Sequence, residues 1–302
     1  MNRYQLNKYL FLFALVILSS SSLFAQDDLL GSLDDEKPPR EYTRNAFKST
    51  RVITAQSMEQ LSKGVLDFRI LHRFGRVNSG AYDAFGFDQA TIRLALDYGI
   101  TDRLTVGIGR SSNKKEIDGF IKYRPIWQSN DGAPFSVLIT SGFVKDGLKW
   151  ADPNRDNYSS SRYSYYHQVL VGRKFSDAFS LQLMPTLVHR NLVLTEEDKN
   201  DIISIGVASR LKLSNRLALT VEYFRHITDL PTGYYDPLSI GFDIETGGHV
   251  FQLHFTNSLG MNERSYIVGT DGQWSKGDIH FGFNISRVFT ISKPKEFRKK
   301  KA

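Results

Sequence analysis

The chain reads Leu66-Asp67-Phe68-Arg69-Ile70 at residues 66–70, and this stretch alternates apolar and polar side chains with a period of two. A β-strand points neighbouring side chains to opposite faces, so the pattern predicts a strand with one apolar and one polar face. The same alternation returns at residues 92–98 and 279–285. A chain of such strands, without a helix-period core, is typical of a transmembrane β-barrel with lipid outside and a polar lumen.

The links between the strands support a closed barrel with an even number of strands. Links after the second, sixth, eighth and tenth predicted strands are short, whereas links after most odd-numbered strands are long and polar. In outer-membrane barrels the short turns face the periplasm and the long loops face outward. We therefore predict an all-β, transmembrane, antiparallel up-and-down β-barrel of about 12 strands, with both termini in the periplasm. The predicted strands cover residues 64–74, 90–98, 104–110, 116–125, 134–143, 162–174, 180–190, 201–213, 216–226, 237–245, 249–257 and 278–289.

The chain divides into four predicted segments. Residues 1–25 have the pattern of a secretory signal peptide, with Arg3 and Lys8 before an apolar run. Residues 26–62 begin as an acidic, proline-bearing lead-in, and their later part either folds against the periplasmic mouth or enters the lumen as a partial plug. Residues 63–291 form the predicted barrel, and residues 292–302 form a basic periplasmic tail. Export combined with amphipathic strands implies the outer membrane of a Gram-negative bacterium.

Composition narrows the function classes. The 302 residues contain no cysteine, which excludes disulfides, thiolate metal sites and lipid attachment at a processed cysteine. The net charge is +7, of which the leader carries +2 and the tail from Lys293 onward carries +5, so the rest of the chain is neutral. This distribution does not favour nucleic-acid binding, because the basic residues in excess lie at the two ends. No cofactor is expected.

The polar parity of the strands predicts which side chains line the lumen. Charges at membrane depth are costly unless they pair or face water. Two interpretations of the inward charges remain open. The first is an ion-pair network that braces a narrow barrel, and the second is a selectivity lining for a small polar solute, or for an anion because Arg and Lys outnumber Asp and Glu. The lumen-lining candidates are Arg69, Arg73, Arg93, Asp97, Lys122, Arg124, Arg210, Lys212, Glu222, Asp243, Glu245, His254 and His280.

The histidines do not predict a metal site or an active site. His254 and His280 have inward parity on adjacent predicted strands, but a third ligand is not apparent, so no metal is expected. The run from His254 to Ser258 contains the residue types of the Ser-His-Asn outer-membrane phospholipases. Consecutive strand residues alternate faces, so His254 and Asn257 point in opposite directions unless the strand ends between them. We therefore assign no catalytic residue.

Four segments of the chain also resemble a known family. They are residues 63–70, 98–104, 181–186 and 241–249. The chain is similar, from about Phe47 to Phe289, to a family of outer-membrane β-barrels catalogued as domain of unknown function 5777. The resemblance implies a barrel in the outer membrane, and it implies no activity, ligand or site residue.

Three functions are compatible with these observations. The first is a passive or gated pore, or transport channel, for small solutes. The second is a non-conducting structural barrel, or one whose loops or tails hold a partner. The third is a lipid-acting enzyme of the outer membrane. The expected partners are outer-membrane lipid, the barrel-assembly machinery acting on a final strand that ends at Phe289, and a small polar or anionic solute.

Overall fold

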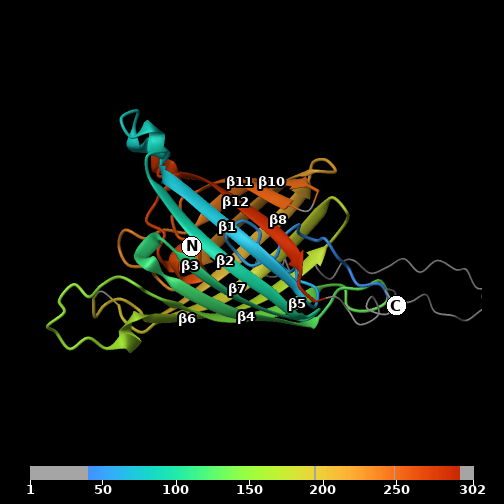
Figure 1. The fold of residues 1–302 in the computed structure, drawn as a ribbon, viewed down its shortest axis with the longest axis horizontal. Coiled ribbons are helices and arrows are strands. Elements are labelled where there is room, and N and C mark those ends of the chain that lie inside the picture. Colours follow the sequence, from blue (N-terminus) through green and yellow to red (C-terminus); the bar gives the residue numbers. More distant parts are fainter. Residues whose placement is uncertain (1–39, 194, 248, 293–302) are drawn as a thin grey trace, which may run out of the picture. The chain divides into compact units, whose positions relative to one another are not determined.

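Twelve antiparallel strands close into one barrel in the computed structural model, which describes residues 40–193, 195–247 and 249–292 (Figure 1). Each strand pairs with its neighbours in sequence, and the first strand pairs with the last, so the sheet has no open edge. The strands are β1 (Val65–Arg76), β2 (Ala90–Thr101), β3 (Leu104–Ser111), β4 (Ile117–Ile126), β5 (Ser136–Lys145), β6 (Tyr163–Lys174), β7 (Phe179–Arg190), β8 (Asp201–Lys212), β9 (Leu217–His226), β10 (Leu238–Thr246), β11 (His249–Thr256) and β12 (His280–Thr290).

The predicted fold class is confirmed, and every predicted strand coincides with an observed one to within a few residues. The predicted signal peptide and almost all of the basic tail lie outside the described residues. No helix in the described ranges has the length and apolar character to cross a membrane. The helices are short and lie in the links: α2 (Glu263–Val268), and the 3-10 turns η1 (Val77–Ser79), η2 (Ala84–Gly86), η3 (Asn113–Lys115), η4 (Ser159–Arg162) and η5 (Trp274–Lys276).

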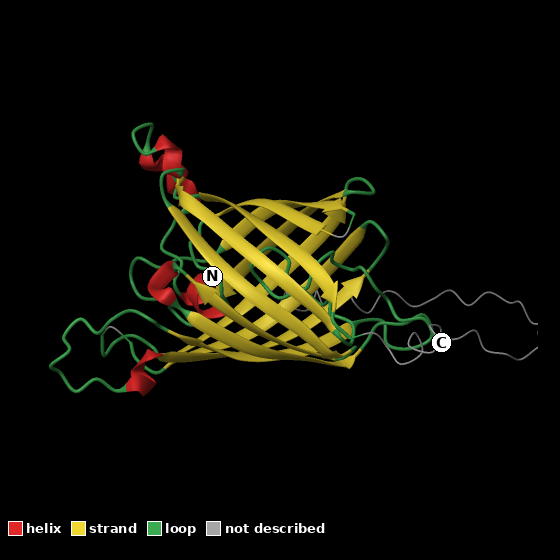
Figure 2. Cartoon of the chain, in the orientation of Figure 1, coloured by secondary structure: helices red, strands yellow, loops and turns green. Residues whose placement is uncertain are grey.

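The two ends of the barrel differ in the length of their links (Figure 2). One end carries the start of β1, the end of β12 and the shorter links, such as residues 102–103 and 213–216; we call it the turn end. The opposite end, which we call the loop end, carries the longer links, such as residues 77–89, 146–162 and 257–279. This alternation is the one that the sequence predicts.

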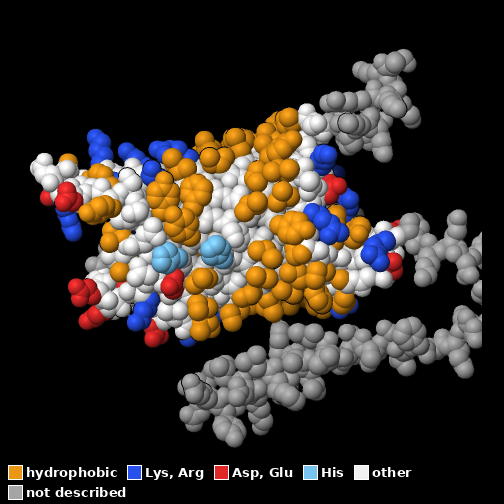
Figure 3. Space-filling model, turned by 90° about the horizontal axis from the view of Figure 1, so that it is seen from below, with side chains coloured by type: hydrophobic (Ala, Val, Ile, Leu, Met, Phe, Trp, Pro, Cys, Tyr) orange, Lys and Arg blue, Asp and Glu red, His pale blue; other side chains and the backbone are white. Residues whose placement is uncertain are grey.

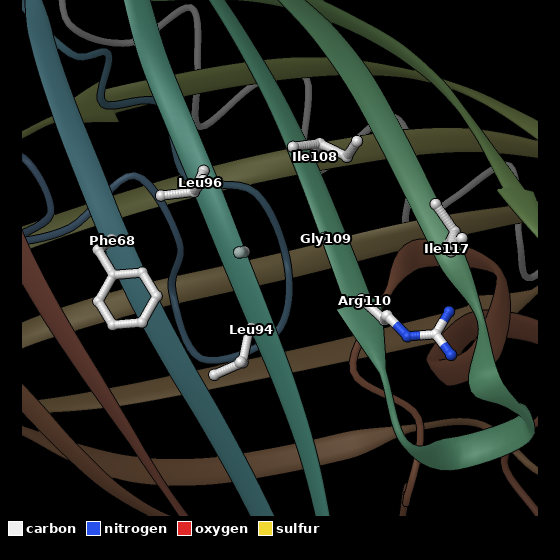
Figure 4. A pocket seen from close by; sticks show the side chains of 8 residues that line it. Phe68, Leu94, Leu96, Ile108, Gly109, Arg110 and Ile117 are labelled. Carbon is white, nitrogen blue, oxygen red and sulfur yellow. The ribbon is translucent and has the colours of Figure 1, made fainter.

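The outer face of the barrel is apolar. Side chains such as Leu94, Leu96 and Ile108 are exposed on it, and Figure 3 shows hydrophobic side chains over the barrel wall with Lys and Arg towards both ends. A shallow apolar groove of about 410 Å³ runs across β1 to β4, lined by Phe68, Leu94, Leu96, Ile108 and Ile117 (Figure 4). An exposed apolar wall with charges near its two ends is the surface that a bilayer requires.

The apolar outer face predicts that the stability cost of a charged substitution depends on its depth in the membrane. We expect Leu96→Arg, near the middle of β2, to lower the free energy of unfolding by about 2–4 kcal/mol, because a cation at the midplane is poorly solvated. The same change at Ile100, near the turn end of the strand, is the matched control and should cost about 0–1 kcal/mol. Urea unfolding of the protein in lipid vesicles measures both. Equal costs at the two positions would contradict a membrane-spanning β2.

The inside of the barrel has a charged part and an apolar part. Charged side chains point inward from β1, β2 and β4 and from β8 to β10, and most of them are buried. On β5 to β8, by contrast, many inward side chains are apolar and almost fully buried: Leu138, Tyr166, Leu170, Met184, Val188 and Ile202. The expectation of a polar lumen therefore fails along these strands, because their inward side chains pack against protein instead of facing water.

Candidate functional site

Residues 40–62 form a hairpin that enters the barrel and is mostly buried from Ala46 onward, and we call it the lumen hairpin. It starts at the turn end, where Arg40 pairs with Asp131 at 2.9 Å and Tyr42 stacks on Trp127 in the β4–β5 link. Within the barrel the chain reverses between Val52 and Ala55, whose backbone N–H and C=O groups bond at 2.8 Å. The chain then returns to the turn end and enters β1. Both ends of the hairpin therefore lie at one end of the barrel, and the segment is visible through the strands in Figures 1 and 4.

Glu222 of β9 holds the tip of the lumen hairpin. Its carboxylate accepts hydrogen bonds from three successive backbone N–H groups, those of Ile53, Thr54 and Ala55, at 2.9–3.1 Å. Successive amides that converge in this way form an anion-binding concavity, and bonds to a charged acceptor are stronger than bonds between neutral groups. The Glu222 side chain is buried, so these donors satisfy a charge that has left water.

Lys122 of β4 binds the middle of the lumen hairpin. Its ammonium donates to the carbonyl oxygens of Thr50 and Ser57 at 3.3 and 3.1 Å, and to Oε1 of Gln56 at 3.2 Å. The side chain is completely buried, and all three acceptors belong to the hairpin. Burial of an ammonium is costly unless its donors are satisfied, so the hairpin carbonyls replace the water that would otherwise solvate it.

Three further basic side chains of the wall bind hairpin atoms. Arg69 donates to the hydroxyls of Ser49 and Thr50, and Arg73 donates to the hydroxyl of Thr54 at 2.8 Å. Arg124 donates to the carbonyl oxygen of Met58 at 2.7 Å. These acceptors are neutral, so the hairpin binds most of the cations on β1 and β4 but does not neutralise their charge.

Other charged side chains of the wall pair with one another. Arg69 lies 2.8 Å from Asp67 and 3.7 Å from Asp97, and Arg93 pairs with Asp118. Glycine makes room for the second pair: a side chain on Gly109 would collide with the Arg93 guanidinium. These contacts resemble the bracing network that is one interpretation of the lumen charges. The ion pairs agree with a bracing role for these residues.

The structure places the predicted lumen residues in two groups. Eleven have buried side chains inside the barrel: Arg69, Arg73, Arg93, Asp97, Lys122, Arg124, Arg210, Glu222, Asp243, His254 and His280. Lys212 and Glu245 are half-buried near the turn end, where Glu245 pairs with Lys48 of the hairpin at 2.7 Å. A role for any of them in solute selection stays a prediction.

A second segment fills the barrel from the loop end. The β11–β12 link contains α2, which begins after Asn262, whose side chain accepts the Ser265 N–H at 2.9 Å. Glu263 pairs with Arg51 of the lumen hairpin at 2.6 Å and accepts a bond from Gln56 at 3.0 Å. Both partners of the ion pair are about 1% exposed, so the hairpin and α2 meet through a buried charge pair.

Two carboxylates connect the link that contains α2 to the rest of the barrel, one directly and the other through a histidine. Glu116, just before β4, accepts bonds from Asn262, Arg264 and Ser265 at 2.6–3.0 Å. Asp236, before β10, contacts His226, whose other ring nitrogen lies 2.8 Å from the Ile267 carbonyl oxygen. Burial alone would raise the pKa of Asp236, but hydrogen bonds from His226 and Arg225 outweigh it and hold that pKa below its usual value. Sequence reasoning missed both anchors, because each joins segments far apart in the chain.

Apolar packing completes the interior. Phe47, Val52, Ala55 and Met58 of the lumen hairpin belong to one buried cluster with Tyr266 to Val268 of α2 and the apolar inward side chains of β5 to β8. The hairpin tip and the wall around it are almost completely buried. The middle of the barrel is therefore filled by protein atoms.

The histidines do not form a catalytic or metal-binding group in the described part of the chain. Both ring nitrogens of His254 and the hydroxyl of Ser258 are buried without a hydrogen-bond partner there, so the two side chains do not bond to each other. Asn257 instead bonds to the backbone of Asp236, Leu238 and Gly272. His280 contacts the Phe74 carbonyl oxygen at 2.8 Å, and no cluster of three metal-ligating side chains occurs in the ranges described. His167 points outward, 2.9 Å from the Ser141 hydroxyl.

The fold and its interior define a transmembrane β-barrel whose lumen is occupied by its own chain. The chain belongs to the family of membrane-bound β-barrel domains called DUF5777, whose profile matches residues 47–289. No curated protein matches the chain in sequence.

Several solved structures match the chain at low sequence identity. The NanC porin is 10% identical and covers 76% of this chain and 100% of its own, with a TM-score of 0.46. The COG4313 outer-membrane channel from Pseudomonas putida F1 is 12% identical and covers 77% of this chain and 98% of its own, also with a TM-score of 0.46. The outer-membrane protein Omp33 from Acinetobacter baumannii is 8% identical and covers 76% of this chain and 100% of its own, with a TM-score of 0.40.

Proposed function

We propose that this protein is a gated channel for small polar solutes, and that the lumen hairpin closes it. The observation that carries the proposal is the environment of Lys122. This buried ammonium has three acceptors, all neutral and all from the hairpin. A wall that was always filled could carry an apolar side chain here at lower cost, whereas a wall that is sometimes wet keeps a cation solvated in both states.

The path of the lumen hairpin allows it to leave the barrel. Both of its ends lie at the turn end, so the segment can move out on that side without threading the chain through the barrel. Much of its contact with the wall consists of hydrogen bonds between hairpin atoms and charged side chains of the wall, and water can replace these bonds when the hairpin leaves. These two features distinguish it from an ordinary core segment.

The wall left behind by the lumen hairpin would favour anions. On β1 and β4, Arg73, Lys122 and Arg124 would lose their hairpin acceptors and face water. On the other side, Glu222 of β9, Glu245 of β10 and Glu263 of α2 would lose their hairpin partners. Arg69 and Arg93 keep the aspartates of the wall as partners. The newly wetted part of β1 and β4 is therefore basic, and it would attract small anions on that side of the lumen.

The location and the partners are part of the same proposal. The barrel sits in the bacterial outer membrane with the turn end and both termini in the periplasm, which agrees with the short links at that end. Outer-membrane lipid covers the apolar wall. The barrel-assembly machinery receives the chain through β12, on which Phe281, Phe283 and Phe289 alternate with inward residues.

Single-channel conductance in planar bilayers tests the proposed function. The full-length protein should be mostly silent, whereas a variant that lacks residues 26–62 should give a steady current that favours anions. Adding Lys122→Met to the truncated variant should reduce the anion preference, and Lys145→Met, an outward residue of β5, is the matched control. Heat-modifiable gel migration verifies that each variant folds. A folded truncated barrel that conducts nothing would contradict the proposal.

One observation favours a second candidate, a barrel that stays filled and acts as a membrane anchor for its loops. The apolar cluster around Phe47, Val52 and Met58 opposes release of the lumen hairpin, because its exposure to water would cost free energy. In that case the truncated variant would be destabilised, and the full-length protein would remain silent under every condition that loosens the hairpin.

A further inference from the structure

A pocket of about 330 Å³ opens among the links at the loop end, and we call it the loop pocket. The β3–β4, β5–β6 and β7–β8 links, together with α2 and the residues after it, contribute to its lining. Its size is at the lower end of the range for small-molecule sites. The loop pocket is separate from Lys122, Glu222 and the lumen hairpin, none of which lines it.

Basic side chains dominate the lining of the loop pocket. Five basic residues line it, whereas Asp146 is its single acidic residue: the basic ones are Lys114, Lys149, Arg162, Arg190 and Arg264. Within the described part of the chain, Arg264 pairs with Glu116, and the other four form no ion pair. Like charges brought together on one concave surface repel each other, and a bound anion removes that repulsion.

Two of these arginines are held in place with donors to spare. Arg190 is 8% exposed, donates through Nη2 to the Lys199 carbonyl oxygen at 2.7 Å, and has no partner for its Nε among the described residues. Arg264 donates to Glu116 at 3.0 Å, and its Nε is likewise buried and unpartnered there. A guanidinium that is fixed by one bond and still has unused N–H groups suits two-pronged binding of a carboxylate or phosphate.

The links around the loop pocket are fixed rather than loose. The Arg162 guanidinium lies 3.6 Å from the centre of the Trp150 ring and donates to the Asp146 and Leu148 carbonyl oxygens. Lys114 has a φ of 49°, in the left-handed region that costs a non-glycine residue energy, and its carbonyl oxygen accepts the Gly147 N–H at 3.1 Å. The basic side chains therefore project from links that are bonded to each other.

We propose that the loop pocket binds a small soluble organic anion through its carboxylate or phosphate group, with Arg190 and Arg264 as the principal contacts. The loop pocket lies at the end of the barrel opposite to the ends of the lumen hairpin. Its proposed role as a binding site does not depend on whether the barrel conducts.

Calorimetric titration of the full-length protein in detergent micelles tests this site. Glucose, glucuronate and glucose 6-phosphate share a sugar ring and differ in charge, so they separate anion recognition from sugar recognition. We expect saturable binding of one or both anionic sugars and none of glucose. Arg190→Gln should weaken that binding at least about tenfold. Lys149 is exposed, so Lys149→Gln should leave the fold intact and weaken the binding by a smaller factor.

The matched control is Arg110→Gln, which removes an exposed arginine that points outward from the end of β3 and does not line the loop pocket. Its affinity should equal that of the unchanged protein. The proposal is overturned if neither anionic sugar saturates below about 10 mM, which is weaker than a specific site requires. It is also overturned if all three variants bind alike, or if the protein binds phosphatidic acid in mixed micelles but neither sugar anion.

Discussion

The change Glu222→Gln is expected to loosen the lumen hairpin and to raise the fraction of time that the barrel conducts by about 10- to 100-fold. The carboxylate accepts the N–H groups of three successive residues at the hairpin tip. A glutamine amide has one acceptor oxygen and no charge, so the tip loses about 1.5–3 kcal/mol of stabilisation. Single-channel recording gives the open fraction of the full-length variant.

Amide hydrogen exchange gives a second measure of the Glu222→Gln variant that does not depend on conduction. The backbone N–H groups of residues 53–55 should exchange about 10- to 100-fold faster than in the unchanged protein, because they are no longer held by a charged acceptor. Asp118→Asn is the matched control, since it removes one buried carboxylate that pairs with Arg93 and does not touch the hairpin. Equal exchange at residues 53–55 in all three proteins would contradict the role of Glu222.

Arg51→Met is expected to lower the free energy of unfolding by about 3–5 kcal/mol, because it leaves the buried Glu263 without its counter-charge. Methionine keeps much of the aliphatic volume of the arginine, so lost packing contributes little. The double variant Arg51→Met with Glu263→Met should be markedly more stable than the sum of the two single changes predicts, because removing both charges abolishes the desolvation cost. Urea unfolding in micelles measures all four proteins. Additive effects would show that the two side chains are not coupled.

The barrel itself could be predicted because each strand carries its own signal. Asp67 and Arg69 alternate with Leu66, Phe68 and Ile70, and this local pattern alone predicts a strand and the direction of its faces. The short and long links then give the strand count and the two ends. None of these inferences needs to know which residues meet across the lumen.

The contents of the lumen could not be predicted in the same way. Glu222 and the amides of residues 53–55 are almost 170 residues apart in the chain, and backbone N–H groups leave no trace in the sequence. On β6 the inward Tyr166 and Leu170 alternate with the outward Tyr165 and Val169, so both faces are apolar or aromatic and the pattern does not reveal which one is covered by protein. For the same reason, the sequence does not decide whether the later part of residues 26–62 folds against the periplasmic mouth or enters the lumen.

The return of the lumen hairpin to the turn end has a consequence for the kinetics of the proposed channel. A segment that is covalently attached to the wall through β1 behaves as a tethered plug, so recapture is unimolecular and does not depend on how much protein is in the membrane. Its effective concentration at the lumen is set by the short chain between the hairpin and β1, and lies in the millimolar range for such a tether. Each opening would therefore be brief unless something outside the barrel holds the plug away.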